Sequence, residues 1–79
     1  MKNRIIEIIA NQACEKPENI SLSQKLRDDL YLDSLDIMEL TICIEKELKL
    51  DTSIRDEVIY SWVTVEDVVN NVLLIENEK

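Results

Sequence analysis

The sequence has 79 residues, a length that fits a single domain over residues 1–79. It has no glycine, which favours helices over tight hairpins, and no histidine, which excludes the usual zinc sites and histidine-based catalysis. Its formal net charge of −8 repels nucleic acids and anionic membranes and favours a partner with a basic patch. Two well-separated cysteines, no signal sequence and no long apolar run predict a cytoplasmic protein with reduced thiols and no membrane insertion.

The first predicted helix covers Lys2–Cys14. Its core-facing residues recur at helical spacing, and they are Ile5, Ile6, Ile9, Ala10 and Ala13. Ile8 is displaced from that face. We expect the helix to end before Pro17, because a residue that precedes proline is disfavoured in helical conformation.

A long connection is predicted from Glu15 to Leu32. Its apolar residues are spaced so that each can anchor the loop on the bundle: Ile20, Leu22, Leu26, Leu30 and Leu32. The segment 21–26 is expected to hold one helical turn, capped by Ser21 or Ser23.

The second helix is predicted from Ser34 to Lys49. Asp33 is its expected N-cap, and Asp36 lies where a carboxylate reaches back to complete a capping box. Ser34 then occupies the first helical position, where free backbone N–H groups and the helix dipole would stabilise an attached phosphate. A capped helix start with an incidental serine is the plainer interpretation of these four residues.

Two apolar stripes run along this second helix. The core stripe is Ile37, Leu40, Ile44 and Leu48. The second stripe is Leu35, Met38 and Ile42, and acidic residues flank it at positions 36, 39, 45 and 47. Either a third helix covers the second stripe, or the stripe binds a transient partner. We expect a mixture, with Leu35 and Met38 the more exposed.

The last third of the chain predicts two further helices. Thr52 or Ser53 would cap a short one over Arg55–Tyr60, with Val58, Ile59 and Trp62 facing inward. Thr64 caps the last helix, which is predicted to end at about Ile75 before a frayed tail over 76–79. The buried face of the last helix is expected to be Val65, Val68, Val69, Val72 and Leu73.

These elements predict an all-α fold, a monomeric up-and-down bundle of three main helices and a short third one, with a long first loop. Ser34 has no histidine or lysine near it in the sequence to act as a base, so it is not expected to be a catalytic nucleophile. We therefore expect a protein that is not an enzyme.

The stretch Asp29–Leu40 follows the pattern Asp-Leu-x-Leu-Asp-Ser-Leu-Asp-x-x-Glu-Leu. This pattern resembles the prosthetic-group site of acyl carrier proteins, and it runs without a gap. The family usually has glycine where this chain has Tyr31. The resemblance implies that a phosphopantetheinyl transferase uses coenzyme A to attach 4′-phosphopantetheine to Ser34. It also implies that Asp33, Leu35 and Asp36 frame the attachment site.

The resemblance further implies that the second helix is the main recognition surface for acyl-processing enzymes with basic docking patches. The predicted partner-binding residues are Leu35, Asp36, Met38, Glu39, Ile42 and Glu45. The implied function is to carry acyl intermediates as thioesters in fatty acid or related biosynthesis. A dedicated aminoacyl, peptidyl or polyketide carrier is the close alternative, and an acidic adaptor without a prosthetic group is a more distant one. Trp62 either shortens an acyl cavity or simply fills the bundle.

Overall fold

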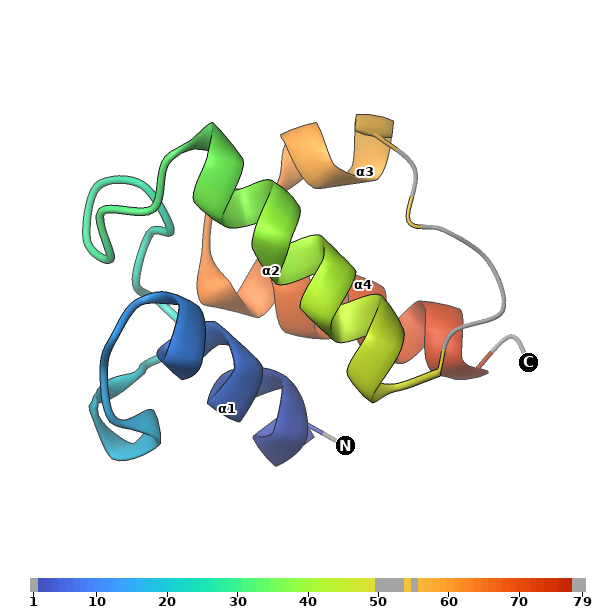
Figure 1. The fold of residues 1–79 in the computed structure, drawn as a ribbon, viewed down its shortest axis with the longest axis horizontal. Coiled ribbons are helices and arrows are strands. Elements are labelled where there is room, and N and C mark those ends of the chain that lie inside the picture. The colour runs from blue at the N-terminus through green and yellow to red at the C-terminus, as the bar shows by residue number, and fades with distance from the viewer. Residues whose placement is uncertain (1, 50–53, 55, 78–79) are drawn as a thin grey trace.

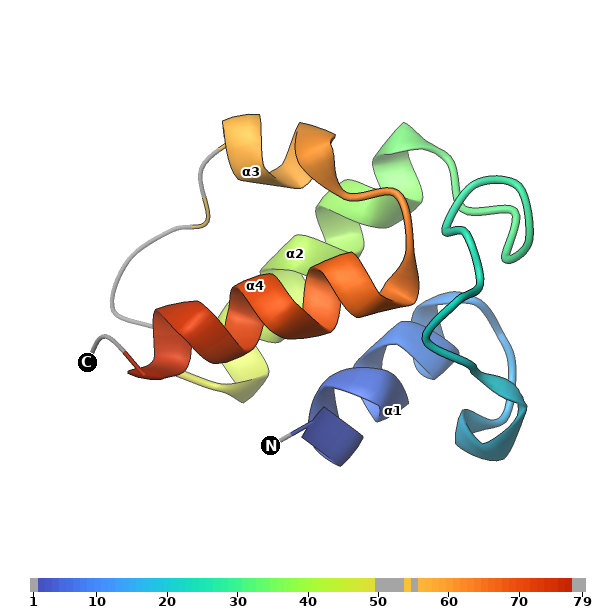
Figure 2. The same cartoon turned by 180° about the vertical axis from the view of Figure 1, so that it is seen from behind.

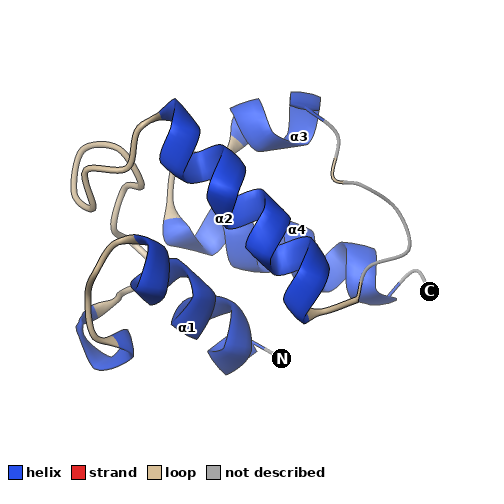
Figure 3. Ribbon diagram, in the orientation of Figure 1, coloured by secondary structure: helices blue, strands red, loops and turns tan. Residues whose placement is uncertain are grey.

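The computed structural model describes residues 2–49, 54 and 56–77. Within this part of the chain the regular structure is entirely helical (Figure 3), which confirms the predicted all-α class. The elements are α1 (Lys2–Gln12), the 3₁₀ helix η1 (Pro17–Asn19), α2 (Ser34–Glu47), α3 (Asp56–Ser61) and α4 (Val65–Asn77). As predicted, three helices are long and the third is short.

Helices α1, α2 and α4 form the body of the bundle (Figure 1). Helix α1 runs opposite to α2, whereas α4 crosses α2 in the same general direction, as the view from behind also shows (Figure 2). Helix α3 runs back toward the start of α2 before α4 begins, so the four helices alternate in direction along the chain and the expected up-and-down order is confirmed (Figure 1). The starts of α2 and α4 consequently lie at the same end of the bundle.

The core between these helices is almost wholly aliphatic. Its buried apolar residues are Ile5, Ile8, Ile9, Leu26, Leu32, Ile37, Leu40, Ile44, Ile54, Trp62, Val65, Val68, Val69 and Val72. Ile8 therefore belongs to the core, contrary to the expectation that it is displaced, because α1 packs against both α2 and α4 and so buries a wide face. Leu48 and Leu73 are only half-buried at the edges of their stripes.

Two helices end slightly earlier than predicted. Helix α1 stops at Gln12 because Cys14 takes a left-handed conformation with φ of 56°, and the amide of Glu15 bonds to the carbonyl of Ala10 at 2.9 Å. This arrangement is a Schellman motif, so the helix does not depend on Pro17 to end it. Helix α2 ends at Glu47 in a similar way, with φ of 51° at Lys49.

The connection over residues 15–32 packs on the bundle as predicted. Leu26 and Leu32 are buried, while Ile20, Leu22 and Leu30 lie half-buried against the core. The expected helical turn over 21–26 is wrong, because the short helix of this loop is η1. A single turn forms at residues 21–24 instead, where the amide of Ser21 bonds to the side chain of Gln24.

The loop is also joined to the start of α4 through an isolated antiparallel bridge between Lys25 and Thr64. Helix α4 begins after Thr64 as predicted but continues through Asn77, beyond the expected end at Ile75. Helix α3 begins at Asp56, and the caps proposed for it at Thr52 and Ser53 lie outside the described residues.

Candidate functional site

The start of α2 is fixed by a reciprocal pair of hydrogen bonds between Asp33 and Asp36. The amide of Asp36 donates to Oδ1 of Asp33 at 2.9 Å, and the amide of Asp33 donates to Oδ2 of Asp36 at 3.1 Å. This capping box confirms the predicted helix start. It also places Ser34 at the first position of the helix.

Ser34 is exposed at a position suited to an anion. Among the residues that the structure describes, the amides of Ser34 and Leu35 have no hydrogen-bond acceptor. The N-terminal end of a 14-residue helix adds the positive end of the helix dipole. Open N–H groups together with that dipole favour a phosphate at this position.

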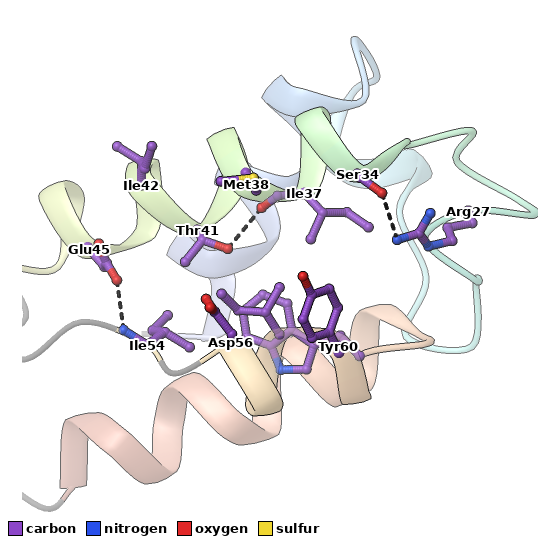
Figure 4. Close-up of a pocket in the computed structure, with 12 residues that line it drawn as sticks. Arg27, Ser34, Ile37, Met38, Thr41, Ile42, Glu45, Ile54, Asp56 and Tyr60 are labelled. Atoms are coloured by element: carbon purple, nitrogen blue, oxygen red, sulfur yellow. Dashed lines mark hydrogen bonds between the residues drawn. The ribbon is translucent and has the colours of Figure 1, made fainter.

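A guanidinium group lies beside the serine hydroxyl (Figure 4). Nη2 of Arg27 donates a long hydrogen bond of 3.4 Å to Oγ of Ser34. Sequence reasoning missed this residue, because it lies in the connection seven residues before Ser34 and only the folding of the loop brings the two together. The available signal in the sequence was that Arg27 is the last basic residue before an acidic stretch that has no lysine or arginine until Lys46.

A cleft of about 330 Å³ opens between α2 and α3. Ser34 and Arg27 lie at one end of it, and Glu45 lies toward the other end, where its Oε2 accepts a hydrogen bond of 2.8 Å from the amide of Ile54 (Figure 4). The walls between these ends are formed largely by apolar and aromatic side chains: Ile37, Met38, Ile42, Ile59, Tyr60 and Trp62. An apolar chain attached near Ser34 fits such walls.

Trp62 belongs both to the core and to the wall of the cleft, and whether it shortens an acyl cavity stays a prediction. Its side chain is only 4% exposed. Among the described residues its Nε1 has no hydrogen-bond partner. The indole therefore limits the cleft from the side of the core while filling the bundle.

The second apolar stripe of α2 is exposed along its whole length. Leu35, Met38 and Ile42 have exposed fractions of 69%, 59% and 49%. Helix α3 therefore leaves this stripe accessible, and Leu35 and Met38 are more exposed than Ile42, as predicted. Met38 and Ile42 also line the cleft, so the stripe and the cleft form one continuous surface with Ser34.

The acidic residues around this stripe differ in their contacts. Asp33 and Asp36 bind each other's backbone in the capping box, and Glu45 is half-buried against the amide of Ile54. Glu39 is exposed and accepts a hydrogen bond of 3.0 Å from Gln12 of α1. Of the predicted site residues, the cleft thus brings together Ser34, Met38, Ile42 and Glu45, whereas Asp33, Leu35, Asp36 and Glu39 lie outside its lining.

These features fit a phosphodiester on Ser34. The hydroxyl is accessible, two open amides and a guanidinium group supply donors for phosphate oxygens, and the adjoining cleft has room for an attached chain. Among the described residues no cluster of metal-ligating side chains occurs, and none of their helices is long and apolar enough to cross a membrane.

A family model described as the phosphopantetheine attachment site matches residues 3–72. The chain therefore belongs to the family of acyl carrier proteins, whose prosthetic group is a covalently attached 4′-phosphopantetheine. An acyl carrier protein of Clostridium perfringens (strain SM101 / Type A) is 39% identical over 69 residues, which are 87% of this chain and 88% of that protein. An acyl carrier protein of Phytoplasma australiense is 39% identical over 66 residues, 84% of each chain.

A solved structure supports the same fold. The apo doublet acyl carrier protein from prodigiosin biosynthesis superposes with a TM-score of 0.76 at 22% sequence identity, over 92% of this chain. The chain spans about a third of that longer protein, 34% of its length. Carrier proteins of this family act together with transferases and acyl-processing enzymes and have a non-enzymatic role.

Proposed function

We propose that Ser34 carries the phosphopantetheine and that residues 1–79 act as a single carrier domain for acyl groups in fatty acid or related biosynthesis. The observation that carries this proposal is the exposed hydroxyl of Ser34 at the first position of α2, beside two open amides and at one end of the cleft. The other serines lack this setting among the described residues. For example, the hydroxyl of Ser61 donates to the carbonyl of Val58.

In the attachment reaction, Oγ of Ser34 accepts the phosphopantetheine group from coenzyme A. A bond forms between Oγ and the phosphorus atom of coenzyme A that bears the pantetheine, and the pyrophosphate bond of coenzyme A breaks. Adenosine 3′,5′-bisphosphate leaves, and the hydroxyl proton passes to a base of the transferase, since this chain offers no histidine. Once bound, the prosthetic group supplies a terminal thiol for thioesters. The capping box of Asp33 and Asp36 holds the turn that presents the hydroxyl.

The partners in this proposal are a phosphopantetheinyl transferase and acyl-processing enzymes with basic docking patches, in the cytoplasm. Leu35, Met38 and Ile42 supply an exposed apolar strip beside the attachment site, and Glu39 adds an accessible carboxylate. A mixed surface of this kind is suited to transient contacts, because the charges steer the partner and the apolar residues bury area on docking.

Intact mass tests the attachment. The wild type, Ser34→Ala and the control Ser23→Ala, which removes an exposed hydroxyl from the long loop, are incubated with coenzyme A and a broad-specificity transferase. We expect one phosphopantetheine on the wild type and on Ser23→Ala and none on Ser34→Ala, with unchanged helical circular dichroism. Modification of Ser34→Ala, or failure of the wild type to be modified by any transferase, would refute the proposal and leave an acidic adaptor in its place.

Transferase kinetics test the docking surface. Glu39→Lys and Met38→Ala should lower kcat/KM for loading by about tenfold or more, while each changes stability by about 0.5 kcal/mol or less, as is usual for exposed positions. Glu18→Lys is the matched control, since it reverses an exposed acid in η1 on the long loop rather than on α2. Equal kinetics for Glu39→Lys and Glu18→Lys would show that α2 is not the docking surface.

A further inference from the structure

We propose that Arg27 binds the phosphate of the phosphodiester on Ser34 and so holds the prosthetic group at the end of the cleft. The inference rests on the proposal that Ser34 is the attachment residue. The motif around Ser34 does not include position 27, and the direct observation is the contact between Nη2 of Arg27 and Oγ of Ser34 at 3.4 Å. Both residues line the cleft.

The contact is well placed for a phosphate. The unesterified oxygens of a phosphodiester on Ser34 are two bonds from Oγ, so they lie within reach of a guanidinium group that already contacts this atom. Guanidinium groups bind phosphate oxygens through charge-assisted hydrogen bonds, which are stronger than the weak bond to a neutral hydroxyl. Loading of Ser34 should therefore strengthen this contact.

The guanidinium of Arg27 is available for this role. Within the described residues it forms no ion pair with a carboxylate, whereas Arg4 pairs with Glu7 and Glu47. The acids that flank Ser34, Asp33 and Asp36, bind backbone amides through their capping box, and Asp29 accepts a hydrogen bond from the amide of Lys25. Arg27 can therefore pair with a phosphate without breaking an existing salt bridge.

Arg27 is also the basic residue that the sequence places nearest the site. Between positions 28 and 45 there is no lysine or arginine; the next base toward the N-terminus is Lys25, and toward the C-terminus it is Lys46, more than three helical turns beyond Ser34. A phosphate on Ser34 adds a negative charge between Asp33 and Asp36. A single cation at this point offsets their repulsion more than any distant base, because exposed charges are screened over about 10 Å.

The backbone around Arg27 is held in place. The neighbouring Leu26 is fully buried, and its amide donates to the carbonyl of Val63 at 2.8 Å. The carbonyl of Leu26 accepts from the amide of Leu32 at 2.9 Å, which ties this point of the loop to the segment just before the capping box. The loop thus presents the guanidinium from a fixed position, so less conformational entropy is lost when it binds phosphate.

The experiment combines loading with charge removal. The wild type, Arg27→Gln and Lys25→Gln are each prepared in apo and loaded forms, with loading verified by intact mass. Lys25 is the matched control, because it is an exposed base on the same loop and no described contact joins its side chain to Ser34. Melting temperatures are compared at low and high salt, and the Arg27 Nε–Hε resonance of the wild type is recorded before and after loading.

The measured quantity is the change in melting temperature on loading, the loaded value minus the apo value. At low salt we expect this change to be roughly 1–5 °C lower in Arg27→Gln than in the wild type, the size of effect expected for one exposed ion pair in a domain of this size. Lys25→Gln should behave as the wild type, and high salt should remove the difference. The Arg27 resonance should shift on loading. An unshifted resonance in the loaded wild type, or equal loading effects in Arg27→Gln and the wild type, would overturn the inference. A wild type that does not gain mass would instead refute the attachment at Ser34.

Discussion

Helices α2 and α4 begin with closely similar hydrogen-bonding patterns. Asp33 and Asp36 form a capping box at the start of α2. At the start of α4 the amide of Asp67 donates to Oγ1 of Thr64 at 3.2 Å, and the amide of Thr64 donates to Oδ2 of Asp67 at 3.0 Å. In each case the residue after the cap opens the helix. That residue is Ser34 in α2 and Val65 in α4.

The two starts differ in what satisfies their first free amides. In α4 the amides of Val65 and Glu66 donate to carbonyls of the long loop, those of Gln24 and Leu22, both at 3.0 Å. In α2 the corresponding amides of Ser34 and Leu35 have no acceptor among the described residues. Val65 is fully buried, whereas Ser34 is exposed.

The comparison shows that the cap alone does not make a site. The same capping chemistry serves packing in α4, where the loop fills the donors, and leaves donors for a ligand in α2. What separates them is the path of the long loop, which covers the start of α4 and then passes to α2 with Arg27 beside Ser34. The proposed attachment at Ser34 therefore depends on a helix start whose first amides have no acceptor among the described residues.

Exchanging the first residues of the two helices should have the largest effect. Val65→Ser removes two methyl groups and buries a hydroxyl, so we expect a loss of about 2–3 kcal/mol in the free energy of unfolding. Ser34→Val should change stability by about 0.5 kcal/mol or less, since the side chain is exposed, but it should abolish loading. Chemical denaturation and intact mass measure the two effects.

This exchange also tests whether a serine after a cap is enough for modification. Val65→Ser has a hydroxyl at the first position of a capped helix, but the amides around it are occupied and the position is buried. In the double variant Ser34→Val with Val65→Ser we expect no phosphopantetheine. A modified double variant that retains its helical spectrum would contradict the distinction drawn between the two starts.

Acid should weaken the start of α4 through Asp67. Hydrogen bonds from the backbone amides of Thr64 and Val63 lower the pKa of this carboxyl below its ordinary value of 3.8. Its stabilising contribution is therefore complete above the unfolded-state pKa of about 4 and is lost as the pH falls through the depressed folded-state pKa.

Asp67→Asn should consequently lower stability at pH 7 by about 1 kcal/mol, comparable to the loss of a cap, and should reduce the further loss between pH 5 and pH 2. Glu66→Gln is the matched control, because it removes an adjacent, exposed carboxylate whose side chain makes no described contact with the cap. Denaturant melts at several pH values measure both variants. A pH dependence that Asp67→Asn leaves unchanged would show that Asp67 does not set the acid stability of α4.

Much of this fold was predictable because local signals and tertiary packing agree. The aspartates around Ser34 fixed the start of α2, and Thr64 fixed that of α4, since a capping side chain needs only neighbours in sequence. The core stripe of Ile37, Leu40 and Ile44 followed from helical spacing and is buried. The prediction that α2 also carries an exposed apolar strip follows from the same spacing.

The parts that sequence reasoning missed depend on the path of the loop or on unusual backbone conformations. Arg27 contacts Ser34 across seven positions of the chain, at a point of the loop where the amide of Leu26 bonds to the carbonyl of Val63 and its carbonyl accepts from the amide of Leu32. The early ends of α1 and α2 arise where Cys14 and Lys49 take left-handed conformations. Such ends are normally marked by glycine, which this chain lacks, so the sequence offered no signal for them.

Tyr31 provides the smallest and most specific test of the comparison. It lies in the approach to α2 with φ of 59°, at the position where the family usually has glycine, and its side chain is 84% exposed. A non-glycine residue in this conformation costs about 1–2 kcal/mol, and glycine in turn loses more entropy on folding. The residues that lead into α4 have no left-handed conformation among those described.

We expect Tyr31→Gly to raise the free energy of unfolding by about 0.5–1 kcal/mol, because relief of the left-handed strain exceeds the added entropy of the unfolded chain. Tyr31→Ala is the control, since it removes the same exposed ring but keeps the Cβ atom that causes the strain, and it should give no such gain. Denaturant melts of the three proteins measure the difference. Loading of Ser34 should proceed in all three, because the capping box and the amides after it do not involve the Tyr31 side chain. If Tyr31→Gly is no more stable than Tyr31→Ala, the left-handed conformation of Tyr31 does not strain the backbone that leads into α2.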